Sequence, residues 1–460
     1  MGFAEYIYRI PEKFRVLIIF SLFTMNNGFS WIMFDPVAEW LEKNVEGLSK
    51  RQLELLSSWQ PVAFLCMCIP VMKIVTQYDG LRFSVCLGTL SEIAGALLKL
   101  IGILTRHTKA GLVFLHIGQI FSGLGSPVAT GAVSALSATW FQPKERTRAT
   151  AVAILFNSVG NALCYLVIPI VTQKLTMVAV VIYELLIAIL VATLAWMYMP
   201  KEHLHRDDQQ MQFSSSSNVN NLPNDSTVEA QGNGEIIACS NAHVSLHRQL
   251  AQLFRIPSCV LLLIVYAWLS GGFAAWISLF AATYNKWFDE TFIGIMSFFG
   301  IFMFVIGGLI MSCLVDLYFS RQMKYVIFFC ITMNSLSNLI FISCTPNDKG
   351  FALLDMGKGF IAFSTGLCGF WNGAAAPLFF ELVAEISFPI EEGVSGICVS
   401  IMENVGALVF YQIISKFFEG QFMTIAYSFG MIVAVALCAA VKQRYKRTYH
   451  TYVYEMAQYS

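Results

Sequence analysis

Twelve apolar stretches of membrane-spanning length fill most of this chain, and one long polar segment near residues 200–250 divides them six and six. A bilayer core requires about 20 apolar residues per helix. Only helices or closed barrels satisfy the backbone polar groups there. The composition agrees, because 57% of the residues are hydrophobic and only 13% are charged. The sequence therefore predicts an all-α polytopic membrane protein with twelve transmembrane helices.

The predicted spans are joined by short loops, which leave no room for a soluble catalytic domain. We expect them at residues 15–40, 52–76, 82–104, 111–138, 149–172, 176–199, 257–284, 291–315, 323–344, 351–377, 393–415 and 421–441. The resulting parts are an N-terminus (1–14), a six-helix bundle (15–199), a linker (200–256), a second six-helix bundle (257–441) and a tail (442–460). The linker is rich in Ser and Asn between Gln212 and Asn224. Because such a segment buries little apolar surface, we expect it to be disordered.

The distribution of basic residues predicts the orientation. With both termini on one side of the membrane, that side holds 18 of the 29 Lys and Arg residues. Short loops rich in Lys and Arg stay in the cytoplasm. We therefore expect the termini and the linker to be cytoplasmic.

Charge and motifs exclude several classes of function. The formal net charge is zero, which gives no reason to expect a nucleic-acid partner. The cysteines are scattered, mostly within apolar runs, so neither a disulfide nor a metal site is expected. No catalytic triad, metal cluster or Gly-x-x-x-x-Gly-Lys-Ser/Thr motif occurs. We expect neither an enzyme nor an ATP-driven pump, and no cofactor.

Three predicted cytoplasmic segments carry charged residues that form a candidate gate. They are Tyr78–Arg82, Trp140–Ala149 and Pro377–Gly393, the last at the end of the tenth span. Glu381 and Glu385 are four residues apart and therefore share one helix face. A carboxylate–arginine latch that closes the cytoplasmic mouth would use Arg82, Glu145, Arg146, Arg148, Glu381 and Glu385. The alternative is that these are solvated interfacial charges.

The combination of these motifs resembles a known family. Gly80-Leu81-Arg82, Trp140-Phe141 with Glu145-Arg146, and Phe380-Glu381 … Glu385 … Pro389 … Glu392-Gly393 are similar to solute carrier family 49, the feline leukaemia virus subgroup C receptor-related transporters. The resemblance runs over nearly the whole chain. It implies the major facilitator fold, in which two bundles rock around a substrate near the midplane. The chain departs from the superfamily motif at Gln77, where an Asp is usual, and has Asp79 beside Gly80 instead.

The resemblance also implies cargoes and a pocket. Its members carry choline and ethanolamine, haem in an older proposal, or vitamin-like compounds such as pyridoxine in a lysosomal branch, so the plasma membrane and the lysosomal membrane both stay open. In the choline branch the pocket has aromatic residues on spans one and seven and glutamines on spans five and eleven. The matching positions here are Trp31, Ala274, Ser158 and Glu403. The stretch Gly272–Trp276 instead resembles the lysosomal branch.

The positions of polar and aromatic residues along the spans predict the substrate site independently. At about 1.5 Å per helical residue, Asn157 and Glu403 fall near the midplane, and Trp31 and Trp276 fall toward the outside. An intramembrane carboxylate costs about 2.5–3.5 kcal/mol on insertion scales, so a functional role is the default. Tryptophan faces attract cations. We predict that substrate contacts Trp31, Asn157, Ser158, Trp276 and Glu403.

These residues also have structural explanations. Glu403 would fit as a protonated acid that is hydrogen-bonded to Asn157 or Asn404. The two tryptophans would fit as packing at the membrane interface, where Trp is enriched. On the third span, Glu92 and Lys99 lie seven residues apart on one face, which we interpret as a structural pair.

The sequence as a whole predicts a monomeric secondary transporter that moves a small organic metabolite, a cation of the choline, ethanolamine or vitamin type, by alternating access. If Glu403 titrates during the cycle, protons drive transport; if it stays ionised, the membrane potential is sufficient for a cation. One alternative is a haem transporter, although no deep basic residue on the cavity-lining spans is available for propionates. The other is a non-transporting receptor or sensor on a transporter scaffold.

Overall fold

The part of the chain that the structure, a computed structural model, describes consists of helices joined by turns and loops, with no strand among the described residues. The described residues are 9–142, 145–174, 176–201, 245–284, 286–319, 321–346, 350–414, 417, 421–442 and 447. Twelve helices within these ranges are long and apolar enough to cross a membrane. The predicted all-α polytopic fold is therefore confirmed, and the protein is an integral multi-pass membrane protein. The Ser- and Asn-rich run at Gln212–Asn224 lies outside the described residues.

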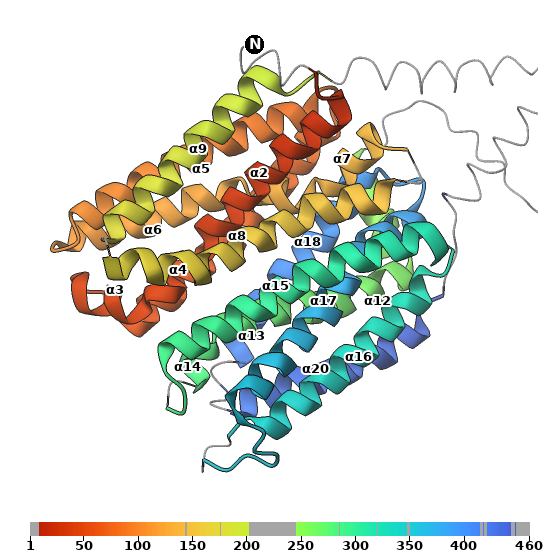
Figure 1. The fold of residues 1–460 in the computed structure, drawn as a ribbon. Helices are drawn as coiled ribbons and strands as arrows, with labels where there is room; N and C mark the ends of the chain where they lie inside the picture. Colours follow the sequence, from red (N-terminus) through yellow and green to blue (C-terminus); the bar gives the residue numbers. More distant parts are fainter. Residues whose placement is uncertain are drawn as a thin grey trace, which may run out of the picture.

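The first six spans lie together on one side of the molecule (Figure 1). They are α2 (Glu12–Ile32) with η1 (Asp35–Val37), α4 (Lys50–Val75), α5 (Gly80–Leu104), α6 (Lys109–Leu124) with η2 (Pro127–Gly131) and α7 (Val133–Trp140), α8 (Arg146–Lys174) and α9 (Met177–Tyr198). A short helix, α3 (Ala38–Asn44), joins spans one and two. A side-chain cap begins α4, where the side chain of Ser49 accepts from the amide of Gln52.

The last six spans form the other half (Figure 1). They are α12 (Pro257–Tyr266) with η4 (Ala267–Gly271), α13 (Gly272–Ser278) and α14 (Phe280–Tyr284), α15 (Glu290–Leu314) with η5 (Val315–Phe319), α16 (Met323–Cys344), α17 (Gly357–Ser387), α18 (Glu392–Val409) with η6 (Phe410–Ile414) and α20 (Gln421–Ala440). The segments η2, η4, η5 and η6 are single π turns. Such turns often mark functional sites in helices.

The two halves contact each other mainly through spans two, four and five of the first half and spans eight and eleven of the second. Helix α8 packs against α15, and α18 packs against α4, η2 and α7. The side chain of Leu155 on α8 lies against Gly308 on α15, and Ile397 on α18 lies against Gly131 on η2. Lys201 and Ser245, which flank the linker, mark one end of the molecule, which we call the linker side.

The structure corrects the predicted extent of the disordered linker. Sequence reasoning assigned residues 200–256 to it, but Leu246–Phe254 forms a helix, α11, that packs against α12 and α18. The spacing of the leucines in α11 explains this packing, because Leu246, Leu250 and Leu253 fall on one face at intervals of four and three residues. The side chain of Gln249 donates to Glu391 Oε1 at 2.9 Å, which fixes this helix to the start of α18.

Candidate functional site

A small cavity of about 60 Å³ lies where the two halves meet. The first half contributes residues of spans one and five, and the second half contributes residues of spans seven, eight and eleven. They are Trp31, Ile32, Asn157, Ser158, Asn161 and Tyr165 on one side, and Ser270, Phe273, Ala274, Ile277, Ser278, Ile301, Phe304 and Glu403 on the other. A concave site with a few polar groups in an apolar lining is typical of small-molecule binding.

In the first half, a contact between two glycines and their neighbours positions the cavity wall. A Cβ atom on Gly28 would lie 2.1 Å from the carbonyl oxygen of Asn157, and one on Gly160 would lie 2.0 Å from that of Met25. Only glycine permits this close approach of α2 and α8. Trp31 stands three residues after Gly28 and Asn157 three residues before Gly160, so the contact places both beside the cavity.

The second half repeats this arrangement at spans seven and eleven. A Cβ atom on Gly271 would lie 2.1 Å from the carbonyl oxygen of Glu403, and one on Gly406 would lie 1.9 Å from that of Ala267. Glu403 precedes Gly406 by three residues, as Asn157 precedes Gly160. Glu403 in the second half therefore occupies the position that Asn157 occupies in the first.

Hydroxyl groups hold the carboxylate of Glu403. Ser270 Oγ donates to Glu403 Oε1 at 2.6 Å, and the hydroxyl of Tyr266 donates to Oε2 at 3.3 Å. Ser270 belongs to the π turn η4, which carries it toward α18. No ion pair to Glu403 occurs within the described ranges, so hydrogen bonds alone fix this carboxylate beside the cavity.

The predicted hydrogen-bond partners of Glu403 lie elsewhere. Asn157 donates to the carbonyl oxygen of Thr24 at 3.0 Å, and Asn404 donates to that of Ser400 at 2.8 Å. Neither amide donates to the carboxylate of Glu403, because each donates instead to a backbone carbonyl oxygen of its own half. Asn157 and Ser158 nevertheless line the cavity, as the sequence predicted for a substrate site.

Aromatic rings form much of the remaining wall. Trp31 lines the cavity with its indole fixed by a 3.1 Å hydrogen bond from Nε1 to the carbonyl oxygen of Ser57. Across the cavity, Phe273 stacks on Phe304 with ring centroids 5.9 Å apart and planes inclined by 14°. Tyr165 from α8 completes the aromatic lining.

The structure does not bring Trp276 to the cavity. Its side chain is fully buried in the second half, stacked on Tyr427 with centroids 5.2 Å apart and edge-on to Phe280 and Phe341. Its Nε1 donates to the hydroxyl of Thr424 at 3.1 Å. Phe273, on the same helix, faces the cavity instead. The prediction for Trp276 as a substrate contact is corrected to a core residue.

On the linker side, one arginine contacts three carboxylates. The guanidinium of Arg447 contacts Glu381 at 2.8 Å, Glu385 at 3.0 Å and Glu392 at 2.9 Å. Burial by itself would lower the pKa of Arg447, but the carboxylates of Glu381, Glu392 and Glu385 raise it above its ordinary value, so this arginine stays charged. Sequence reasoning missed Arg447 because nothing in the tail distinguishes it from the neighbouring basic residues.

Polar contacts between the halves gather around this cluster. Arg146 Nη1 lies 3.0 Å from Glu392 Oε1. Arg148 Nε lies 3.0 Å from the buried carboxylate of Asp316. The hydroxyl of Thr150 donates to Glu381 Oε1 at 2.9 Å. All three contacts join the start of α8 to the second half and hold the linker side closed.

These contacts correct the predicted latch. Glu381 and Glu385 share one face, as expected, but their arginine partner is Arg447, whereas Arg146 and Arg148 pair with Glu392 and Asp316. The other two predicted gate residues pair within the first half. Arg82 lies 3.4 Å from Asp79, and Glu145 lies 2.8 Å from Lys13.

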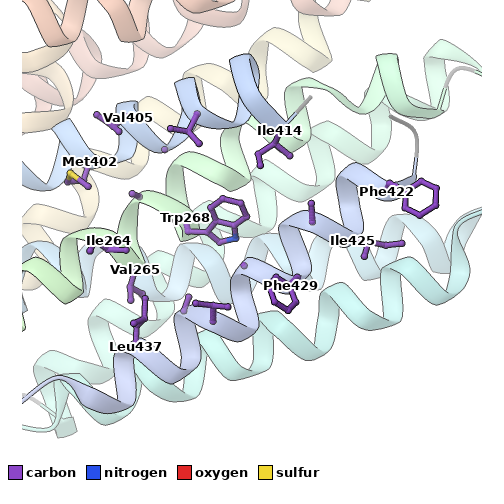
Figure 2. A pocket seen from close by; sticks show the side chains of 17 residues that line it. Ile264, Val265, Trp268, Met402, Val405, Ile414, Phe422, Ile425, Phe429 and Leu437 are labelled. Carbon is purple, nitrogen blue, oxygen red and sulfur yellow. The ribbon is translucent and has the colours of Figure 1, made fainter. Parts of the chain in front are cut away.

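A second, larger hollow of about 660 Å³ lies on the second half between spans seven, eleven and twelve. Figure 2 shows that its labelled side chains are apolar apart from the indole nitrogen of Trp268. That nitrogen donates to the carbonyl oxygen of Tyr427 at 2.9 Å. The exposed side chains of Ile264, Phe422 and Phe429 flank the hollow. It has no polar group to orient a substrate, and it suits contact with lipid chains.

The described residues contain no cluster of side chains that could bind a metal ion. No group of three or more His, Cys, Asp or Glu residues there is arranged to hold a metal ion. None of the described cysteines forms a disulfide.

Comparisons with known proteins identify the superfamily. A family model for the Major Facilitator Superfamily matches residues 20–411. The choline/ethanolamine transporter FLVCR1 of Felis catus is 25% identical over 410 residues, which are 87% of this chain and 66% of that protein. This chain thus spans just under two thirds of that relative. A solute carrier family 49 member 4 homolog of Xenopus laevis is 22% identical over 426 residues, 86% of this chain and 83% of that protein.

A solved structure shows the same fold. The crystal structure of the major facilitator transporter FucP in the outward conformation superimposes with a TM-score of 0.62 at 14% identity, over 93% of this chain and 99% of that one. At 14% sequence identity, the superposition shows only that the two proteins share a fold. Together with the matching family model and the relatives from solute carrier family 49, which the motifs predicted, it establishes that the chain belongs to the major facilitator superfamily.

Proposed function

We propose that this protein is a secondary transporter that moves a small organic cation of the choline, ethanolamine or vitamin type by alternating access. The fold supports transport, because major facilitator proteins bind substrate between two halves that rock around it. The cavity at the contact between the halves is where such a substrate would sit. The relatives named as choline/ethanolamine transporters favour the same class of cargo.

The observation that carries the proposal is the carboxylate of Glu403. It lies at the cavity, and its partners are the hydroxyls of Ser270 and Tyr266 rather than a basic side chain. A carboxylate in a membrane is costly unless it faces a cavity or a partner of opposite charge. A cationic substrate would supply the missing charge and would gain a strong interaction in a site of low dielectric constant.

The aromatic lining suits the same ligand. Trp31, Phe273 and Phe304 lie around the space that Glu403 faces. Aromatic faces attract quaternary and primary ammonium groups, at about 0.5–2 kcal/mol each depending on exposure. The cavity volume is about 60 Å³, which is room for only a few water molecules, since each needs at least about 10–15 Å³ of such space. Substrate entry therefore requires the halves to move apart, and a small cation demands less movement than a porphyrin.

The linker side supplies a gate for this cycle. The contacts of Arg146, Arg148 and Thr150 with the second half must break before the cavity opens there. We place this side in the cytoplasm, because it carries the excess of Lys and Arg. The protein would then reside in the plasma membrane or the lysosomal membrane and alternate between this closed state and one open to the cytoplasm.

Uptake into proteoliposomes tests the proposal. Radiolabelled choline, ethanolamine, pyridoxine and haem are compared for the full-length protein and for Glu403→Gln. We expect saturable uptake of at least one of the cations, and we expect its loss in the variant. The matched control is Asp289→Asn, an exposed carboxylate paired with Lys358 that should leave uptake unchanged. Uptake of haem alone, or cation uptake that survives Glu403→Gln, contradicts the proposal.

A further inference from the structure

Inside the first half, and outside the cavity, three ionisable side chains form a cluster that is closed to solvent. Glu92 and Lys99 of α5 and Glu184 of α9 are 1%, 0% and 1% exposed. The sequence suggested a pair between Glu92 and Lys99. In the structure, Lys99 Nζ instead forms its ion pair with Glu184 Oε1, and it also donates to Ser30 Oγ at 2.7 Å. Glu92 is thus a second buried carboxylate beside a single ammonium group.

The partner of Glu92 is an amide. Asn26 Nδ2 donates to Glu92 Oε2 at 2.6 Å. The side chain of Asn27 also interacts with the Glu92 carboxylate. Within the described residues, no hydrogen bond of ordinary geometry reaches the other two oxygens of the pair, Glu92 Oε1 and Asn26 Oδ1. Two unpaired acceptors in the same buried pair are unfavourable. A proton on Glu92 Oε1 converts that oxygen into a donor, for which Asn26 Oδ1 is an unused acceptor in the same side-chain pair.

The surroundings of Glu92 do not compensate a negative charge. The charged groups that act on it are Glu184 of α9 and Lys99 of its own helix, and Glu184 already pairs with Lys99. The helices α2, α4 and α6 face this region with uncharged side chains: Asn26, Asn27, Gln60, Gln119 and Ser122. The histidine of α6, His116, is engaged by Trp59, and Cys164 of α8 lies near the Lys99–Glu184 pair. An ionised Glu92 would leave one uncompensated buried charge.

The cluster is connected to the cavity through α2. Asn26 and Ser30, which bind Glu92 and Lys99, stand one turn apart on this helix. The next residue, Trp31, lines the cavity, and its carbonyl oxygen accepts from Gln119 at 3.0 Å. Between them, Gly28 touches the backbone of Asn157 on the same cavity wall. A change of proton occupancy at Glu92 therefore acts on the helix that carries a predicted substrate contact.

We propose that Glu92, paired with Asn26, is a proton-binding site that couples substrate transport to proton movement. The step is the reversible reaction of the Glu92 carboxylate with one proton to give the carboxylic acid, and no other group changes. The acid form satisfies the pair in the state described here, and the ionised form belongs to a state in which α2 has moved. This inference rests on the proposed function and adds the coupling ion to it.

The decisive variant is Glu92→Gln, because its amide mimics the protonated acid. Gln retains one donor and one acceptor, so it keeps both contacts with Asn26 and does not titrate. Choline uptake into proteoliposomes is measured with the outside acidic and with equal pH on both sides. We expect the full-length wild type to take up choline severalfold faster with the outside acidic, and Glu92→Gln to show equal rates. The control Asp289→Asn should respond as the wild type does.

A second readout does not need a substrate. If the native state holds a proton on Glu92 that the unfolded chain releases, the melting temperature of the wild type falls relative to that of Glu92→Gln as the pH rises from acidic to alkaline. Parallel pH profiles for the two proteins overturn the inference. Choline uptake that is independent of pH in the wild type also overturns it while the proposed function stands. Absence of choline uptake in the wild type counts against choline as the cargo, and the melting profiles still decide the proton site.

Discussion

The backbone of Gly271 lies so close to the carbonyl oxygen of Glu403 that a Cβ atom there would stand 2.1 Å from it. The same distance separates a Cβ atom on Gly28 from the carbonyl oxygen of Asn157. These two contacts fix span seven on span eleven and span one on span five. The polar residues of the cavity therefore owe their positions to backbone packing.

Replacement of Gly271 by alanine should displace α18 and with it the carboxylate of Glu403. We expect the overpacked variant to lose about 1–3 kcal/mol of stability and to bind its cation more weakly. Thermal unfolding of the purified protein, with and without choline, measures both effects. Gly294→Ala is the control, because nothing lies within 4 Å of a Cβ atom at that position. Equal behaviour of the two variants would show that the close contact is dispensable.

Much of this architecture could be predicted from the sequence, because membrane spans are set by length and apolarity alone. The convergence of Trp31, Asn157, Ser158 and Glu403 on one cavity also agrees with their depth along the spans. The chain carries a further signal of the same site. Asn157-Ser158-Val159-Gly160 and Glu403-Asn404-Val405-Gly406 are two copies of one pattern. They mark the equivalent glycine contacts of the two halves.

The misplacement of Trp276 has a specific physical cause. The π turn at Ala267–Gly271 adds one residue to its turn, and each extra residue rotates the rest of the helix by roughly 100° about its axis. Counting the rise per residue therefore gives the depth of Trp276 but not the face of the helix on which it lies. The pairing of Arg447 with Glu381 could not be predicted from the sequence either, because these residues are 66 positions apart and meet only through tertiary packing.

Substitutions of Trp276 and Trp31 should have different effects: the first should mainly lower the stability of the fold, and the second should mainly weaken cation binding. Trp276→Ala removes a fully buried ring from an aromatic core and should cost about 3–5 kcal/mol of stability. Trp31→Ala removes a ring that is only partly buried, so it should cost less stability than Trp276→Ala and should weaken cation binding. Melting curves together with choline binding to the purified proteins distinguish these results. A loss of binding in Trp276→Ala at full stability would return that residue to the substrate site.

Arg447→Gln should open the linker side. The substitution leaves Glu381, Glu385 and Glu392 without their shared cation, and breaking such a buried cluster typically costs about 3–5 kcal/mol. Because Arg447 stays charged in alkaline solution, raising the pH should not reproduce the effect. A cysteine placed at Ala138 should react faster with a membrane-impermeant maleimide applied from the linker side. Lys358→Gln, which breaks an exposed pair with Asp289, is the control and should change nothing measurable.

The two hydroxyls on Glu403 should contribute unequally to cation binding. Ser270 donates at 2.6 Å and Tyr266 at 3.3 Å, so the shorter bond should hold the carboxylate more firmly. A hydrogen bond to a charged group is worth about 1.5–3 kcal/mol, and about 1.4 kcal/mol corresponds to a tenfold change in affinity. We therefore expect Ser270→Ala to weaken choline binding at least roughly tenfold and Tyr266→Phe to weaken it less. If Tyr266→Phe has the larger effect, the carboxylate turns toward the tyrosine when the cation binds, and Ser270 serves only the empty cavity.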